Sequence, residues 1–166
     1  DRFGEVGAAE PIGKSYSYSN AGFNTLGAVV ETKSGKPVEI CLDQLIYEPL
    51  RMDDSYHHEV ADKLDGKLER MSVVYYKRDG KWIQGWKPGQ SPKYPFVRAS
   101  GGMISTAMDY AIFCQMYLNG GVYGGKRILK TETVKLMTTP YTESLYTPVQ
   151  KSEQEHYYGY GWRVHK

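Results

Sequence analysis

A tyrosine and an asparagine two positions apart form the most distinctive pair of chemically active side chains in this sequence. Tyr18 and Asn20 directly precede an apolar pattern with helical spacing. On an extended segment, residues two apart point the same way, so both polar groups can reach one cleft. The phenol can pass a proton, and the carboxamide can donate a hydrogen bond to a carbonyl. The alternative is structural: Ser19 or Asn20 caps the helix, and Tyr18 packs its ring beneath it.

Other catalytic and metal-binding patterns are absent from the sequence. There is no Gly-x-Ser-x-Gly, no P-loop and no His-Glu-x-x-His. The carboxylates are interspersed with lysines, so we expect them at a solvated surface. All four histidines stand in polar surroundings, so we expect them to be exposed and predict neither a metal site nor a cofactor. They are His57, His58, His156 and His165.

Length and composition are those of one globular domain. The chain has 166 residues, of which 40% are hydrophobic and 24% charged, which excludes a disordered or collagen-like protein. No apolar run approaches the ~20 residues that cross a bilayer, and residues 1–5 lack the organisation of a signal peptide. The net charge of +2 is too small to favour nucleic acid as a partner. Cys41 and Cys114 stand among apolar residues and are expected to be buried, inert thiols.

Two helices are predicted directly after the candidate pair. Apolar residues at steps of three and four predict the first over 20–34, with Gly35 as its C-terminal stop. Pro37 opens the second, because a proline in the first turn removes no needed donor, and Pro49 ends it. The apolar residues of the first helix are Phe23, Leu26, Val29 and Val30. The expected buried stripe of the second is Ile40, Cys41, Leu45 and Ile46.

A hairpin and two further helices are predicted in the rest of the chain. Asp79-Gly80 supplies the positive φ angles of a tight turn between strands over 71–76 and 81–86. Residues 87–95 are expected to form a loop, in which Ser91 and Tyr94 could line a cleft. Thr106 and Asp109 fit the start of a helix that continues to Gly120. A last helix over 131–138 stops before Pro140.

The two ends of the chain indicate a piece of a longer protein. Asp1 is not a methionine, and residues 158–164 alternate as a half-buried strand should. No partner strand follows in the sequence, and a single strand is not stable without neighbours. We therefore expect one partial domain over 1–166, with a helical subdomain at about 20–140 and a sheet strand at about 158–164.

Several segments resemble the serine beta-lactamase-related family of class C beta-lactamases, DD-peptidases and family VIII esterases. The match runs from Tyr18-Ser19-Asn20-Ala21-Gly22-Phe23 through 26–31 and 34–37 to 46–52. Ala99-Ser100-Gly101-Gly102-Met103-Ile104-Ser105-Thr106-Ala107-Met108-Asp109 resembles a second recurrent block. Segments 118–121, 125–129 and 158–162 extend the likeness in the same order. The resemblance implies an α+β fold: the mostly helical subdomain of the serine beta-lactamase/transpeptidase-like fold, with a β-hairpin and one strand of an incomplete α/β sheet.

The same resemblance implies acyl transfer through a serine on a Ser-x-x-Lys turn, with an amide, lactam or ester as substrate. It assigns Tyr18 to relay a proton beside that lysine, and Asn20 to orient the acyl-side amide. A Lys-Thr-Gly or His-x-Gly strand would close the site. None of these three motifs occurs in the sequence, so only Tyr18 and Asn20 carry over, and flanking segments or another chain must complete the site.

The family resemblance also implies no cofactor, a small-molecule or peptidoglycan-like acyl substrate, and a periplasmic or secreted location. Two other functions stay open. The chain could be a non-catalytic module that binds a glycan or a protein through its 15 Tyr and 3 Trp, although these rings could equally fill the hairpin face and the terminal strand. Alternatively, another chain supplies the serine, because an unpaired edge at 158–164 would seek a partner.

The first prediction concerns the gene rather than the polypeptide. If the nucleophile precedes Tyr18 as in the family, the hundred or so codons before Asp1 encode one Ser-x-x-Lys motif. Sequencing the gene together with N-terminal analysis of the native protein tests this. A start codon immediately before Asp1 would contradict the expectation of a truncated chain.

Overall fold

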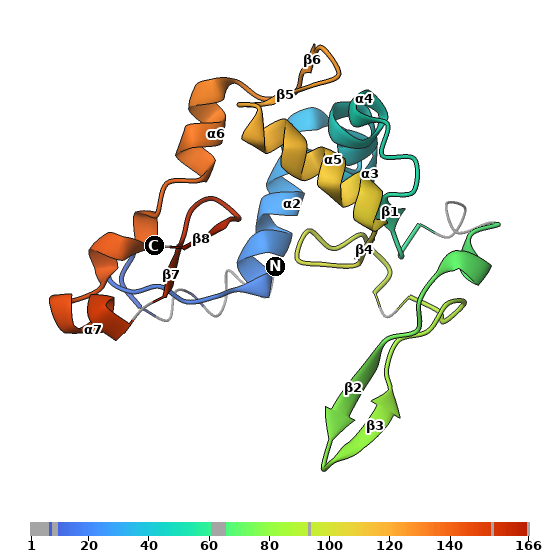
Figure 1. Ribbon diagram of the computed structural model, residues 1–166, viewed down its shortest axis with the longest axis horizontal. Coiled ribbons are helices and arrows are strands. Elements are labelled where there is room, and N and C mark those ends of the chain that lie inside the picture. The colour runs from blue at the N-terminus through green and yellow to red at the C-terminus, as the bar shows by residue number, and fades with distance from the viewer. Residues whose placement is uncertain (1–6, 8–9, 61–65, 93, 154, 166) are drawn as a thin grey trace. The chain divides into compact units, whose positions relative to one another are not determined.

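The computed structural model describes residues 7, 10–60, 66–92, 94–153 and 155–165 (Figure 1). The chain divides into two compact units, one of residues 20–113 and one of residues 1–19 with 114–166. Residues 1–5, where the sequence showed no signal peptide, lie outside the described residues. Among the described residues, no helix has both the length and the apolar character that a membrane span requires.

The first unit begins with the two predicted helical segments. Helix α2 (Asn20–Ser34) has the predicted bounds, and Gly35 follows it with a φ of +68°. The second segment consists of α3 (Val38–Leu42), a π-helical turn (Asp43–Tyr47) and α4 (Glu48–Leu50). It ends one residue beyond Pro49, where Arg51 adopts a left-handed conformation with a φ of +56°.

The buried face of the second segment differs from the prediction. Cys41 is buried as expected, but Leu45 is 66% exposed and Ile40 37% exposed, and Tyr47 and Leu50 are buried instead. The π-helical turn explains the difference from Leu45 onward, because its wider i→i+5 bonding shifts these residues away from a regular helical spacing. Both cysteines are free thiols, Cys41 buried and Cys114 half-buried.

A small sheet and a buried carboxylate connect distant parts of this unit. Strand β1 (Tyr56–His57) pairs antiparallel with β4 (Met103–Ile104). Helix α5 (Ala107–Leu118) follows β4, and the amide of Asp109 donates to the Thr106 hydroxyl at 3.1 Å, which confirms the predicted cap. The Asp109 carboxylate accepts hydrogen bonds from the amide of Asp54 and the hydroxyl of Ser55, both at 2.9 Å. Asp109 is therefore buried rather than solvated as predicted.

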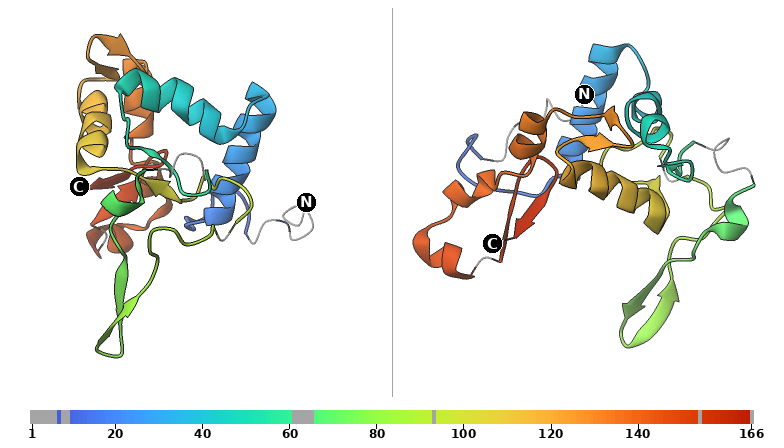
Figure 2. Two further views of the ribbon diagram at one scale, coloured as in Figure 1. Left: turned by 90° about the vertical axis from the view of Figure 1, so that its right-hand side faces the viewer. Right: turned by 45° about the horizontal axis from the view of Figure 1, so that its top comes forward.

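The predicted hairpin and its turn are confirmed, but its first strand lies at 75–78 rather than 71–76, and its second ends at Gln84 rather than Trp86. A 3-10 turn (Leu68–Arg70) precedes strands β2 (Tyr75–Arg78) and β3 (Lys81–Gln84). Asp79 and Gly80 occupy the turn with φ of +50° and +76°, the two positive angles that a tight hairpin turn requires. The described residues of 87–95 form no helix or strand, as expected. Figures 1 and 2 show the hairpin extending from the rest of its own unit.

The second unit contains the C-terminal elements. Strands β5 (Val122–Tyr123) and β6 (Lys126–Arg127) pair with each other, and helix α6 (Thr131–Met137) matches the predicted last helix. A 3-10 turn (Tyr141–Leu145) and α7 (Pro148–Glu153) follow. The last elements are β7 (His156–Tyr158) and β8 (Arg163–His165).

The prediction of one continuous, unpartnered strand over 158–164 is wrong. Strands β7 and β8 pair antiparallel with each other, so this segment contains a turn. The amide of Gly159 donates to the carbonyl of Trp162 at 2.8 Å, and Gly161 has a φ of +79°. Two glycines in this turn permit a reversal that the alternating pattern alone did not indicate.

The second prediction compares two leucines on the same helical segment. Leu50 is 1% exposed and Leu45 is 66% exposed. We expect Leu50→Ala to lower the free energy of unfolding by about 2–5 kcal/mol, because it removes buried apolar surface and leaves a cavity. Leu45→Ala, the matched control, should change it by less than about 0.5 kcal/mol. Denaturant unfolding measures both, and equal effects would contradict the observed burial.

Candidate functional site

The phenol of Tyr18 lies at the surface. The side chain is 64% exposed, in the segment that leads directly into helix α2. More than half of the surface of the Tyr18 side chain is thus accessible.

A cluster of phenols and one guanidinium accompanies Tyr18 in the same unit. The rings of Tyr16 and Tyr158 stack with centroids 4.7 Å apart, and Arg163 donates to the Tyr158 hydroxyl at 3.0 Å. Burial, reinforced by the neighbouring phenols including Tyr18, raises the pKa of Tyr16 to about 12. The hydrogen bond from Arg163 lowers the pKa of Tyr158. This cluster can hold a proton on Tyr16 and stabilise negative charge on Tyr158.

Asn20 is the first residue of helix α2, in the other unit. Asn24, one turn later, accepts a hydrogen bond from the amide of Ser100 at 3.1 Å. A Cβ placed on Gly27 would lie 2.9 Å from the Cβ of Ala99, so helix and loop approach too closely for a side chain there. Residues four apart share a face of a helix. Asn20 and Asn24 therefore lie on the face of α2 that meets the loop around Ser100.

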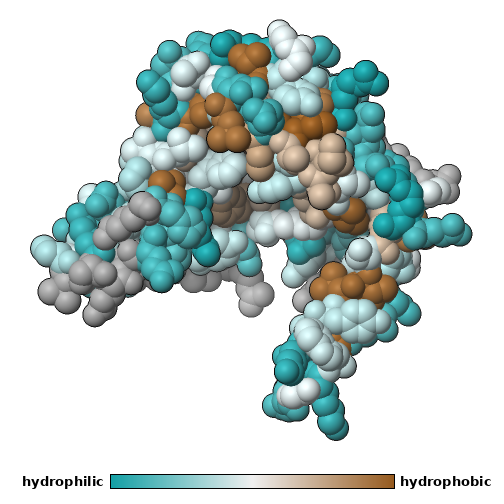
Figure 3. Space-filling view, viewed as in Figure 1, coloured by the Kyte–Doolittle hydropathy of each residue, from teal (hydrophilic) through white to brown (hydrophobic). Residues whose placement is uncertain are grey.

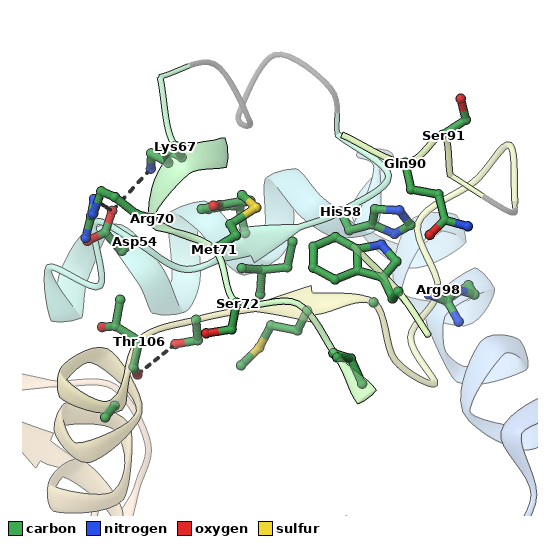
Figure 4. A pocket seen from close by; sticks show the side chains of 18 of the residues that line it. Asp54, His58, Lys67, Arg70, Met71, Ser72, Gln90, Ser91, Arg98 and Thr106 are labelled. Atoms are coloured by element: carbon green, nitrogen blue, oxygen red, sulfur yellow. Dashed lines mark hydrogen bonds and ion pairs between the residues drawn. The ribbon is translucent and has the colours of Figure 1, made fainter. Parts of the chain in front are cut away.

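A cavity of about 870 Å³ lies within residues 54–107 of the first unit (Figure 4). Its wall contains Ser91 and Tyr94, which confirms the expectation for this loop. Figure 4 shows Asp54, Lys67 and Arg70 at one end and His58, Gln90 and Arg98 at the other. Apolar residues also line the cavity: they include Met71, Val74, Trp86, Met103 and Ile104.

An ion pair fixes the first polar end of the cavity. Arg70 donates to both carboxylate oxygens of Asp54, at 2.9 and 2.6 Å, and Lys67 lies 3.7 Å from the same carboxylate. The hydrogen bond from Arg70 is the main reason that the pKa of Asp54 is lowered. Two cations thus face the Asp54 carboxylate at this end of the cavity.

The second polar end contains buried ionisable groups that the sequence did not indicate. Glu59 has a side chain only 2% exposed, paired with the Nε of Arg98 at 2.7 Å. The Arg98 guanidinium also lies over the ring of Tyr94, 4.8 Å from its centroid. The expected solvation of the carboxylates is therefore wrong for Glu59 as well. A carboxylate can be buried here because Arg98 compensates its charge.

The prediction of exposed histidines is wrong for His57 and His58, which are 5% and 8% exposed. His57 belongs to strand β1, and the amide of His58 donates to the carbonyl of Gly102 at 2.9 Å. The His58 ring meets Trp86 edge to face, with centroids 5.6 Å apart. These partners lie far along the chain, so the local polar surroundings could not reveal the burial. His165 is exposed and His156 half-buried.

Within the described ranges, no three His, Cys, Asp or Glu residues are placed to hold one metal ion. Buried nitrogens without a hydrogen-bond partner do occur there: Nδ1 of His57, Nε2 of His58 and Nε1 of Trp86. Two of these nitrogens therefore belong to residues that line the cavity, His58 and Trp86.

Comparison with known proteins identifies the class of this chain. The beta-lactamase family model matches residues 1–166. A "Putative D-alanyl-D-alanine carboxypeptidase" of Escherichia coli K12 is 26% identical over 164 residues, covering 92% of this chain and 35% of that protein. An "N-acetylmuramyl-L-alanine amidase" of Bacillus subtilis is 30% identical over 143 residues, covering 77% and 32%. The octameric penicillin-binding protein homologue from Pyrococcus abyssi superposes with a TM-score of 0.66 at 25% identity, over 96% of this chain and 32% of its own.

The chain therefore belongs to the beta-lactamase family. This confirms the resemblance stated from the Tyr18–Phe23 and Ala99–Asp109 segments, and with it the α+β class of the serine beta-lactamase/transpeptidase-like fold. The chain spans 35% of the length of the carboxypeptidase-like relative. The relatives are hydrolases of the beta-lactamase, DD-peptidase and amidase type.

The third prediction uses the buried His57. Burial lowers its pKa below the ordinary 6.5, partly offset by the charge of Glu59. The unfolded chain therefore binds more protons between the lowered pKa and about 6.5, so stability is complete above that range and falls as the pH decreases through it.

Denaturant unfolding at a series of pH values from 7 to 5 measures this slope. We expect His57→Gln to reduce the loss of stability in that interval, by at most about 1.4 kcal/mol per pH unit. His165→Gln, at an exposed histidine, is the matched control and should leave the slope unchanged. Equal slopes for the His57 variant and the unaltered chain would contradict the account.

Proposed function

We propose that this chain supplies the tyrosine and asparagine of an acyl-transfer site in a longer serine hydrolase. The observation that carries the proposal is the exposed phenol of Tyr18, 64% accessible, two positions before the start of α2 at Asn20. In the beta-lactamase family to which the chain belongs, a phenol and a carboxamide at this spacing serve a serine nucleophile.

The catalytic roles proposed for Tyr18 and Asn20 follow from the chemistry of a phenol and a carboxamide. The serine oxygen attacks the substrate carbonyl and transfers its proton to a neighbouring base; the leaving group then receives a proton through the Tyr18 hydroxyl. The Asn20 carboxamide donates a hydrogen bond to the acyl-side carbonyl of the substrate. Water finally hydrolyses the acyl-serine ester and regenerates the hydroxyl. The sequence contains no Ser-x-x-Lys, so we place the nucleophile in a segment outside these 166 residues.

We propose an amide of the peptidoglycan type as the substrate, with lactams and esters as related acyl donors. The names of the two relatives refer to D-alanyl-D-alanine and to N-acetylmuramyl-L-alanine. The cavity that residues 102–107 help to line supports this assignment, because polar and apolar side chains together form its wall and suit an amphipathic acyl group. Such a substrate places the whole enzyme in the periplasm or outside the cell.

A non-catalytic role is the second candidate function. Its support is the exposure of several aromatic side chains on the β2–β3 hairpin, including Trp82 at 71%.

A third possibility is that another chain, rather than flanking segments of the same chain, supplies the serine. This is compatible with the same catalytic roles for Tyr18 and Asn20. Activity measurements on the isolated chain and on the longer enzyme separate these possibilities.

The fourth prediction concerns catalysis. The purified 166-residue chain should release no product from nitrocefin or a chromogenic ester, because it lacks the nucleophile and the donors that stabilise the oxyanion. In the longer enzyme, Tyr18→Phe should lower kcat by about 10²–10⁴, the usual contribution of a general acid or base.

Tyr160→Phe is the matched control, since Tyr160 is a similarly exposed phenol, at 58%. It should retain full activity. A burst of product from the isolated chain that survives Tyr18→Phe would refute the proposal. Equal kcat values for the Tyr18 variant and the unaltered enzyme would remove Tyr18 from the mechanism.

A further inference from the structure

An arginine on strand β8 is held against a tyrosine on strand β7. Tyr158 and Arg163 are directly paired in the β7–β8 register. The hydroxyl of Tyr158 accepts hydrogen bonds from Nη2 of Arg163 at 3.0 Å and from its Nε at 3.3 Å. The amide of Tyr158 in turn donates to the Thr142 hydroxyl at 2.8 Å. The guanidinium of Arg163 is therefore positioned by the hairpin backbone and by one phenol.

One edge of this guanidinium remains available for a ligand. Tyr158 occupies the edge that Nε and Nη2 form, which leaves two parallel N–H groups on the Nη1–Nη2 edge. Arg163 is exposed. Its side chain forms no ion pair, and no hydrogen bond other than these two, with a residue that the structure describes. Two parallel N–H groups on a planar cation match the two oxygens of a carboxylate.

The segment that carries Tyr18 lies beside this arginine, within the same unit. The ring of Tyr16, two positions before Tyr18, stacks on that of Tyr158 with centroids 4.7 Å apart, and Figure 1 shows the segment before α2 passing β7. The hydrogen bond to Tyr158 is the main reason that the pKa of Arg163 is raised, and the phenols of Tyr16 and Tyr18 contribute to it. A group bound at Arg163 is therefore within electrostatic range of the Tyr18 hydroxyl.

The surroundings of Arg163 suit an anion better than an apolar or cationic group. Tyr16, whose pKa burial raises to about 12, keeps its proton and can act as a second hydrogen-bond donor. In Figure 3 the visible surface around α7, in the same unit, is mostly hydrophilic. A guanidinium without a carboxylate partner among the described residues, next to a phenol that donates, is a site for a carboxylate from outside these 166 residues.

We propose that Arg163 binds the free carboxylate of the substrate's leaving group, so that the enzyme removes a terminal amino acid. This inference rests on the proposed function, in which the leaving group receives its proton through Tyr18. In an amino acid, the amine that takes this proton and the carboxylate are attached to one carbon. A carboxylate site near Tyr18 therefore selects a leaving group that ends in a free acid.

The reaction at this site balances without any further reactant. The C–N bond of the terminal amide breaks, the acyl group passes to the serine, and the free amino acid leaves with its carboxylate on Arg163. The name of one relative, a putative carboxypeptidase, is in keeping with this class of substrate.

A matched pair of peptides tests this inference on the longer native enzyme. Diacetyl-L-lysyl-D-alanyl-D-alanine carries the terminal carboxylate, and its C-terminal amide replaces that group by a neutral carboxamide. The unaltered enzyme should cleave the acid with a kcat/KM about 10–100-fold above that of the amide, the range expected for hydrogen bonds to a charged group. Arg163→Gln should remove this preference by raising KM for the acid, with little change for the amide.

Two further variants separate the geometry of the site from charge and from folding. Arg163→Lys keeps the charge but loses the paired N–H groups, so it should recover only part of the preference. Lys135→Gln, the matched control, removes an exposed cation from α6 in the same unit. It should leave both kcat/KM values within twofold of the unaltered enzyme.

The inference is overturned if the acid and the amide are cleaved equally well, or if Arg163→Gln lowers kcat/KM for both alike, as loss of a structural contact would. Tyr18-dependent cleavage of a chromogenic ester, without cleavage of either peptide, would also overturn it and leave the proposed function intact. Conversely, an acid preference that depends on Arg163 in an enzyme that Tyr18→Phe leaves fully active would support the carboxylate site and remove the proposed role of Tyr18.

Discussion

The unit formed by residues 20–113 depends on the close approach of helix α2 to the loop around Ser100. Gly27 makes this approach possible, because a Cβ there would lie 2.9 Å from that of Ala99, inside normal contact distance. The hydrogen bond from the Ser100 amide to Asn24 fixes the register of the contact. The lack of a side chain at Gly27 and the hydrogen bond to Asn24 thus determine how α2 packs against the Ala99–Asp109 segment.

The same loop organises the cavity. Arg98 precedes it and pairs with the buried Glu59, and the carbonyl of Gly102 accepts a hydrogen bond from the amide of His58. These contacts join β1, β4 and the loop into one wall. The pairing of Glu59 with Arg98 offsets part of the cost of burying that carboxylate.

The sequence predicted the helix ends and the turn that depend on residues close together in the chain. Gly35 ended α2, Asp79-Gly80 formed the hairpin turn, and Thr106 capped α5, because each acts within a few residues. Burial of His57 and Glu59 depends on partners far along the chain, and no nearby pattern reports it. The π-helical turn and the chain reversal at Gly161 were also missed, because the sequence patterns around them have regular helix and strand spacing. The lining residue Ser91 was predicted from the sequence, whereas the ion pairs Asp54–Arg70 and Glu59–Arg98 required the structure. The roles of Tyr18 and Asn20 stay predictions.

The central claim is that Tyr18 and Asn20 serve a hydroxyl nucleophile that these 166 residues do not contain. Labelling the longer native enzyme with a fluorophosphonate, followed by peptide mapping by mass spectrometry, tests it most directly. The account predicts a single modified serine outside this sequence, within a Ser-x-x-Lys motif, and no label on any peptide from residues 1–166. A modified serine or threonine inside this sequence, at stoichiometric yield, would contradict it.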